Sequence, residues 1–174
     1  MSHELRWNPL LREWIIVSID RSQEIEEKSR PIYGNERFTL VLPFFAMWPL
    51  EMHIYGSIPA KMLNELNEQL RLMLADAIRA ATAIYEECLG EDYAYMIIFH
   101  QAPSKGEYPE YRLHVEFYSP QLSKEKVKYA AGIEWGAGTF TYDGVPEERA
   151  AQLREAGATA LTNIEHLGTL SRDT

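Results

Sequence analysis

The sequence predicts an α+β fold, in which a long helix packs on one face of an antiparallel sheet and further helices follow near the C-terminus. First, polar and apolar residues alternate over residues 111–118, which is typical of a strand that buries one face. Second, apolar residues recur at steps of three and four over residues 63–88, which indicates an amphipathic helix. Third, predicted strands lie both before and after this helix, and that order favours an α+β fold with one face of the sheet covered.

The first predicted element is a pair of strands over residues 5–18, rich in β-branched and aromatic side chains, with Asn8-Pro9 as the expected turn. Residues 19–30 are polar and charged, and we expect a linker or a short exposed segment there. We therefore divide the chain into an N-terminal strand pair with its linker, residues 1–30, and a main domain, residues 31–174.

The main domain begins with two predicted strands, residues 36–43 and 50–55. Between them lies an aromatic segment, residues 43–49, with a proline at each end, which favours a packed connection over a ladder strand. The long helix follows, and Ser57 and Pro59 are its expected cap and first-turn residues.

After the helix, we expect strands over residues 93–99 and 111–118, joined by a loop over residues 102–109 that contains two prolines. Residues 127–135 are expected to be helical. Residues 146–156 predict a final amphipathic helix, whose acidic first turn suits the helix dipole.

Composition excludes several classes of protein. The net charge of −9, without a basic run, argues against binding to nucleic acid or to anionic membranes. The single cysteine, Cys88, excludes a disulfide or a cysteine-based zinc knuckle within one chain. The longest apolar run, residues 38–50, is too short to span a bilayer, and the N-terminus lacks a signal-peptide pattern. We therefore expect a cytoplasmic protein.

The polar face of the strand at residues 111–118 is the best candidate for chemistry. Its side chains are Arg112, His114, Glu116 and Tyr118. If the preceding strand pairs antiparallel with it, His100 approaches His114 and Glu116. Two imidazoles and one carboxylate suit zinc or iron(II). The alternative is that this face serves hydrogen bonding alone.

The remaining histidines are expected to have no chemical role. His53 lies in a predicted strand beside aromatic residues, and we expect a hydrogen-bonded structural histidine. His3 and His166 lie near the two ends of the chain, and we expect both to be exposed.

Several segments, in order, resemble the galactose-1-phosphate uridylyltransferase family. They are ELRWNPL (4–10), EWIIVS (13–18), PFFAMWPLE (43–51), FHQAP (99–103), RLHVE (112–116), KYAAGIE (128–134) and PEE (146–148). The resemblance concerns mainly the C-terminal half of that family, which belongs to the histidine-triad superfamily. It implies a histidine-triad-like transferase domain over residues 31–174. It also implies a nucleotidyltransferase of galactose metabolism, which moves a uridylyl group between hexose 1-phosphates.

The resemblance implies roles for particular residues. The implied metal ligands are His100, His114 and Glu116. The implied substrate-binding residues are Lys128, Ile133, Glu134 and Phe140, in a loop that reaches the hexose phosphate across the subunit interface of the family's dimer. The family's nucleophile lies in a His-Pro-His segment, which is absent from these 174 residues. Because Glu116 stands at the position of that nucleophile, we assign no catalytic residue.

Three interpretations stay open. The chain is part of a uridylyltransferase whose nucleophile comes from another polypeptide, or a non-catalytic dimeric binding module, or an internally deleted gene product. The expected partners are a second copy or a complementary catalytic-half polypeptide, with UDP-hexose or hexose 1-phosphate as ligand. We expect the chain alone to be inactive. We also expect Phe44, Phe45 and Trp48 to expose apolar surface that a partner would cover.

Overall fold

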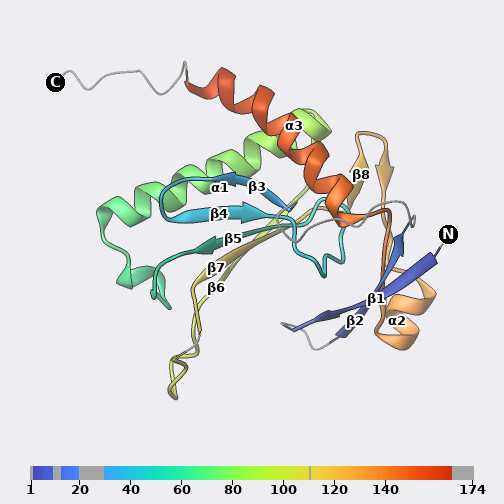
Figure 1. The fold of residues 1–174 in the computed structure, drawn as a ribbon, viewed down its shortest axis with the longest axis horizontal. Coiled ribbons are helices and arrows are strands. Elements are labelled where there is room, and N and C mark those ends of the chain that lie inside the picture. Colours follow the sequence, from blue (N-terminus) through green and yellow to red (C-terminus); the bar gives the residue numbers. More distant parts are fainter. Residues whose placement is uncertain (1, 10–12, 20–29, 110, 166–174) are drawn as a thin grey trace.

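Five antiparallel strands form the main sheet, in the order β3-β4-β5-β7-β6. The structure is a computed structural model that describes residues 2–9, 13–19, 30–109 and 111–165 (Figure 1). The strands of the main sheet are β3 (Pro31–Gly34), β4 (Phe38–Val41), β5 (Met52–Gly56), β6 (Met96–His100) and β7 (His114–Tyr118). The predicted antiparallel α+β fold is confirmed.

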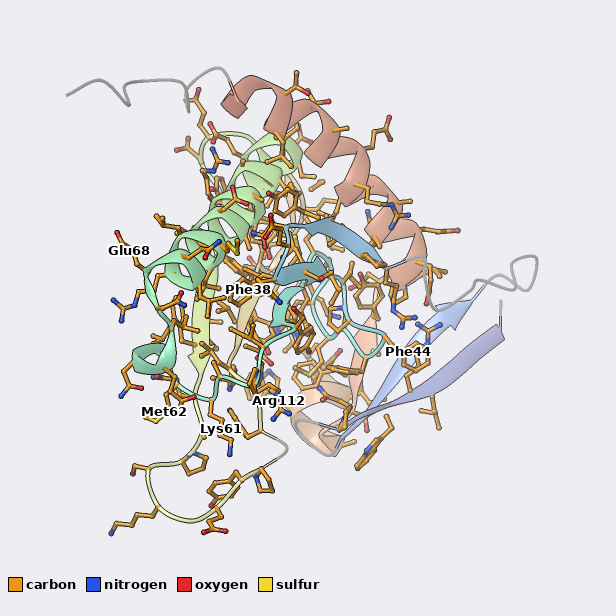
Figure 2. The ribbon with its side chains drawn as sticks, turned by 60° about the vertical axis from the view of Figure 1, so that its left-hand side comes forward. Phe38, Phe44, Lys61, Met62, Glu68 and Arg112 are labelled. Carbon is orange, nitrogen blue, oxygen red and sulfur yellow. The ribbon has the colours of Figure 1, made fainter. Side chains whose placement is uncertain are left out.

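Two helices cover one face of this sheet, α1 (Glu68–Leu89) and α3 (Pro146–Glu165) (Figure 1). Phe38 lies in the layer between this face and α1 (Figure 2). Val115 and Phe117 of β7 also point into this layer and are fully buried, as the alternation predicts. Burial of such side chains away from water is the main force that holds the layers together.

The long helix begins later than predicted. Residues Leu63–Glu65 form a separate 3-10 turn, η2, and α1 begins after Asn67, whose side chain accepts a hydrogen bond from the Leu70 N–H. Asn67 therefore supplies the cap that we expected from Ser57, because it satisfies an N–H of the first helical turn. The helix ends at Gly90, where φ is 85°, a conformation that glycine adopts readily.

A second sheet joins the two N-terminal strands to a strand that lies late in the sequence. Its strands are β1 (Ser2–Asn8), β2 (Glu13–Ile19) and β10 (Phe140–Tyr142), with β10 parallel to β2. The predicted N-terminal strand pair is confirmed, whereas β10 was not predicted. The predicted linker over residues 19–30 lies largely outside the described residues, as does His166, and the side chain of His3 is not described.

The prediction of a helix over residues 127–135 is wrong in its first half. β9 (Lys126–Val127) pairs with β8 (Gln121–Ser123), and the Lys128 N–H donates a hydrogen bond to the Pro120 carbonyl. These backbone bonds keep the chain extended, so helix α2 spans only Gly132–Ala137.

The segment at residues 43–49 is packed, as its prolines predict, but its aromatic side chains are not the exposed surface that we expected. Phe44 is partly buried beneath the guanidinium groups of Arg6 and Arg30, which lie 4.0 and 5.1 Å from its ring centroid. Both guanidinium groups also bind the Glu147 carboxylate at 3.2 Å, and Phe44 lies toward the N-terminal strands in Figure 2. Trp48 is partly buried and contacts Phe140, at 6.3 Å between ring centroids. Among the described residues, no helix is both long enough and apolar enough to cross a membrane.

Candidate metal centre

The side chains of the candidate centre lie on the face of the main sheet opposite the helices. His114, Glu116 and Tyr118 point to this face, because alternate residues of β7 fill the core. In the sheet register, His100 of β6 lies opposite His114, and His53 of β5 lies opposite Glu116. The predicted approach of His100 to His114 and Glu116 is thus confirmed.

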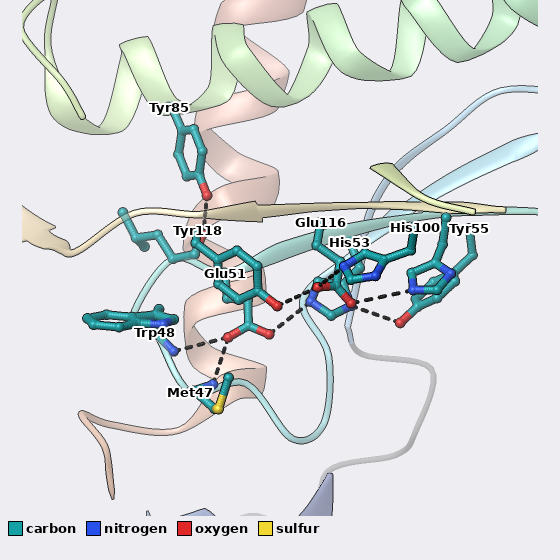
Figure 3. A network of polar contacts seen from close by, with 11 residues as sticks. Met47, Trp48, Glu51, His53, Tyr55, Tyr85, His100, Glu116 and Tyr118 are labelled. Carbon is teal, nitrogen blue, oxygen red and sulfur yellow. Dashed lines mark hydrogen bonds and ion pairs between the residues drawn. The ribbon is translucent and has the colours of Figure 1, made fainter. Parts of the chain in front are cut away.

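Glu116 is the centre of this group and is only 3% exposed. One of its oxygens, Oε2, lies 2.8 Å from His100 Nε2 and accepts a hydrogen bond from the Tyr118 hydroxyl at 2.5 Å (Figure 3). The other, Oε1, lies 3.5 Å from His114 Nε2 and 3.8 Å from His53 Nδ1. Three imidazoles and a phenol therefore surround one carboxylate.

The surroundings of Glu116 keep it ionised. Burial opposes its ionisation, but the hydrogen bond with His114, the nearby His53 imidazole and the Tyr118 hydroxyl together lower its pKa to about 2. Conversely, although burial lowers the pKa of His114, its contacts with Glu116 and with the Arg112 carbonyl raise that pKa above the ordinary value. Burial and the nearby Glu51 and Glu116 charges raise the pKa of Tyr118, so its hydroxyl remains a donor.

The imidazole rings of His100 and His114, two of the candidate ligands, lie parallel to each other. The rings of His100 and His114 stack at 4.7 Å between centroids, with 4° between their planes. His114 Nδ1 lies 2.9 Å from the Arg112 carbonyl oxygen, which requires a proton on Nδ1 and leaves Nε2 facing Glu116. Ligand atoms of His100, His114 and Glu116 all lie within 4.8 Å of one another. A backbone carbonyl that orients an imidazole in this way is a usual neighbour of a metal-binding histidine.

A second row of buried polar groups, in β5 and in the residue just before it, supports the centre. Glu51 is 1% exposed and accepts hydrogen bonds from the Met47 and Trp48 N–H groups, at 2.7 and 3.1 Å. It also binds His53 Nε2 at 2.9 Å, while His53 Nδ1 lies 2.8 Å from the Tyr55 hydroxyl (Figure 3). His53 is a hydrogen-bonded structural histidine, as predicted. The sequence analysis missed Glu51, although its spacing from His53 and Tyr55 places all three on one face.

The residues that the resemblance implies for substrate binding lie elsewhere, around β10. Lys128 is 7% exposed, and its Nζ donates to the carbonyls of Met47, at 3.0 Å, and of Thr141. Glu134 accepts hydrogen bonds from the Ala131 N–H at 3.1 Å and from the Thr141 hydroxyl at 2.6 Å.

These contacts lower the pKa of Glu134, and the four implied substrate-binding residues differ in how far they are exposed to solvent. The Thr141 hydroxyl, together with backbone N–H groups, outweighs burial and lowers the pKa of Glu134 to about 2. Phe140 is partly buried, whereas Ile133 is 44% exposed. The structure therefore brings three of the four residues together as packed or hydrogen-bonded groups and leaves Ile133 at the surface.

Comparison with known proteins relates this arrangement to a family. A family profile described as the C-terminal domain of galactose-1-phosphate uridyl transferase matches residues 7–168. The galactose-1-phosphate uridylyltransferase of Thermotoga maritima is 35% identical over 134 residues, which are 76% of this chain and 42% of that protein. The chain belongs to this family. It spans less than half the length of the curated relatives that it matches, so it corresponds to their C-terminal half.

Solved structures agree with this membership. A uridylyltransferase structure superposes with a TM-score of 0.71 at 34% identity, over 76% of this chain and 42% of the other. A zinc-bound histidine-triad family protein from Mycobacterium smegmatis gives a TM-score of 0.54 at 14% identity, over 76% of this chain and 86% of that protein. At that identity the second likeness concerns the fold alone, and it confirms the predicted histidine-triad-like sheet.

Proposed function

We propose that these 174 residues form a metal-binding module of the hexose-1-phosphate uridylyltransferase family that does not transfer uridylyl groups by itself. The observation that supports this most directly is the environment of Glu116. A nucleophile needs a free lone pair and a group that activates it. Glu116 instead has its two oxygens in contact with four side chains and a pKa of about 2, which makes it a weak nucleophile.

The metal in this proposal is zinc or iron(II), held by His100, His114 and Glu116. The donor set fits, since two imidazoles and one carboxylate bind either ion. The Arg112 carbonyl orients His114, and the Tyr118 hydroxyl orients Glu116, as hydrogen-bonded neighbours of metal ligands do. His100 is 36% exposed, which gives an ion a route from solvent. The metal would tie β6 to β7 and supply stability.

The ligand in this proposal is a hexose 1-phosphate or a UDP-hexose, the class to which the names of the relatives point. Its contacts would come from Lys128, Ile133, Glu134 and Phe140. The first candidate function is one half of a transferase whose nucleophile another polypeptide supplies, and the second is a non-catalytic binding module that keeps the fold and this ligand. The engagement of Lys128 and Glu134 with backbone groups favours that candidate, because neither side chain is free to follow a reacting phosphate.

One assay tests whether the chain transfers uridylyl groups by itself. The purified chain is incubated with UDP-glucose and galactose 1-phosphate, and products and intact protein mass are measured. We expect neither UDP-galactose nor a uridylyl adduct on the protein. Formation of either would overturn the proposal and demand a nucleophile elsewhere. Calorimetric titration with galactose 1-phosphate then tests the binding module, and a lack of heat under conditions where the protein is folded would exclude it.

A separate measurement tests the metal. Elemental analysis of protein freed from loosely bound ions should find about one zinc or iron per chain. The matched variant is His100→Ala, with His53→Gln as the control because His53 lies beside the three ligands without belonging to the set. A metal content that His100→Ala leaves unchanged would contradict the assignment.

A further inference from the structure

The hairpin formed by β6 and β7 carries two of the candidate metal ligands where its loop begins and ends. His100 is the last residue of β6 and His114 the first of β7, and they lie opposite each other in the register. The loop between them extends beyond the sheet (Figure 1), and its residues 103–109 are exposed. Exposed loops with few buried contacts open at a low free energy. The spacing of the two histidines therefore depends on what holds the two ends of this loop.

One end of the loop is bonded to a segment that precedes α1, residues 60–65, which we call the bridging segment. The Ala102 N–H donates a hydrogen bond to the Lys61 carbonyl at 3.0 Å. The Gln101 side chain accepts a hydrogen bond from the Leu63 N–H, also at 3.0 Å. The chain is thus fixed to the bridging segment directly after the end of β6.

The other end of the loop is bonded to the same segment. The Leu113 N–H donates a hydrogen bond to the Ala60 carbonyl at 2.9 Å, and the Leu113 side chain is buried in the core. The neighbouring Arg112 donates hydrogen bonds to two carbonyls of the loop, and its own carbonyl oxygen lies 2.9 Å from Nδ1 of His114. Figure 2 shows Lys61 and Arg112 where the loop leaves the sheet. The bridging segment therefore holds both ends of the loop.

The bridging segment is itself anchored to the core and to α1. Ala60, at its start, and Leu66, just past its end, are both buried. Within the segment, the Glu65 carboxylate accepts a hydrogen bond from the Lys61 N–H at 2.9 Å, which holds the turn η2 closed. Asn67, the cap of α1, directly follows Leu66. The segment thus connects the two ends of the exposed loop to the long helix.

We propose that the bridging segment positions the metal ligands, and that metal binding and closure of the loop stabilise each other. Ligands that are already held together bind a metal with a smaller loss of conformational entropy. Conversely, a metal bound by His100 and His114 would join the two ends of the loop and oppose its opening. By linkage, the two effects are equal in size. This inference rests on the proposed metal site, and it assigns a positioning role to Gln101, which is outside the ligand set.

The first test is hydrogen exchange of the 174-residue chain with and without zinc, followed at single N–H groups by nuclear magnetic resonance. We expect exchange at Leu63, Ala102 and Leu113 to slow by at least about tenfold when zinc is bound. The control is the Asn35 N–H, which is bonded to the Phe38 carbonyl in the turn between β3 and β4, at the opposite edge of the sheet. Its exchange should change by less than about twofold, because the metal does not join β3 to β4.

The second test removes one bond of the bridging segment and leaves the three candidate ligands in place. Gln101→Ala deletes the acceptor of the Leu63 N–H and should lower zinc affinity by about fivefold or more, measured by competition with a chromophoric chelator. It should also speed hydrogen exchange at Leu113, at the far end of the loop, in the zinc-bound protein. Gln152→Ala, at an exposed glutamine of α3, should change neither quantity. Circular dichroism verifies that both variants fold.

Three results would overturn the inference, and each has a different meaning. Zinc binding that leaves exchange at the three N–H groups unchanged, or that slows exchange at Asn35 equally, would exclude the coupling and leave the metal assignment standing. A zinc affinity of Gln101→Ala equal to that of the native protein would exclude the positioning role. A native protein that binds no zinc would overturn the inference together with the assignment of zinc to this site. The outcome of the uridylyl transfer assay bears on none of these.

Discussion

Two buried polar clusters meet at the segment that spans residues 43–51, and they are built differently. In the Glu116 cluster, side chains bind other side chains, as in the contacts of Glu116 with His100 and Tyr118. In the Lys128 cluster, side chains bind mainly backbone, as Lys128 does to the carbonyls of Met47 and Thr141. A cluster of side chains can exchange a hydrogen bond for a metal without moving the chain. A cluster tied to backbone cannot release its partners without loosening the loops that it holds.

The largest expected effect concerns the backbone-bound cluster. Lys128→Met should lower the free energy of unfolding by about 3 kcal/mol, because it leaves the Met47 and Thr141 carbonyls without their charged donor. Urea denaturation of the metal-free protein measures this. Lys105→Met, at an exposed lysine, is the control. If Lys128→Met and Lys105→Met are equally stable, Lys128 is not a structural clamp of these loops.

The second prediction concerns the side-chain cluster. Glu116→Gln should lower zinc affinity by more than about tenfold, since it replaces an anionic ligand by a neutral one. It should lower the free energy of unfolding of the metal-free protein by about 2 kcal/mol, through loss of the charge-assisted contacts with His100 and His114. Competition with a chromophoric chelator measures the affinity. Glu107→Gln, at an exposed carboxylate, should change neither quantity.

Much of the fold follows from local sequence pattern. The alternation over residues 111–118 was sufficient to orient β7, and the helical period was sufficient to find α1, because each of these elements shows one buried face in its own sequence. β10 was not predictable in this way. It has three residues, and its partner, β2, lies near the N-terminus, far from β10 in the sequence. Pairing so distant in sequence leaves no local signal.

The candidate centre was predictable for a related reason. Once β6 and β7 are taken as antiparallel neighbours, the register brings His100 to His114 and Glu116. The spacing of Glu51 from His53 and Tyr55 offered a signal that was not used, but its contacts with the Met47 and Trp48 N–H groups belong to a bend that no sequence period describes. The burial of Lys128 was also hidden, since it depends on carbonyls of the 43–51 segment and of β10.

A smaller effect tests how far the Glu116 cluster extends. Tyr118→Phe removes one hydrogen bond to the Glu116 carboxylate and should lower the free energy of unfolding by about 1 kcal/mol. It should also weaken zinc binding by roughly tenfold, as loss of a hydrogen bond to a metal ligand does. Tyr129→Phe is the control, because Tyr129 is 81% exposed. Unchanged zinc affinity in Tyr118→Phe would confine the centre to the three ligands themselves.

The smallest expected effect is a dependence of stability on pH in the Lys128 cluster. The pKa of Glu134 falls from its ordinary value of 4.5 to about 2, with the Thr141 hydroxyl as the main cause. A carboxyl with a lowered folded-state pKa contributes stability above the unfolded pKa and loses it as the pH falls through the folded pKa. The advantage in melting temperature of the native protein over Glu134→Gln should therefore be largest above pH 4.5 and shrink toward pH 2.

The control for this measurement is Glu148→Gln, at an exposed carboxylate near the start of α3. Glutamine at position 134 keeps an oxygen that can accept from the Ala131 N–H and the Thr141 hydroxyl, so the variant removes mainly the charge. A difference in melting temperature between the native protein and Glu134→Gln that stays constant from above pH 4.5 down to pH 2 would mean that the charge of Glu134 is not what holds α2 to β10. The contrast between the two clusters would then disappear.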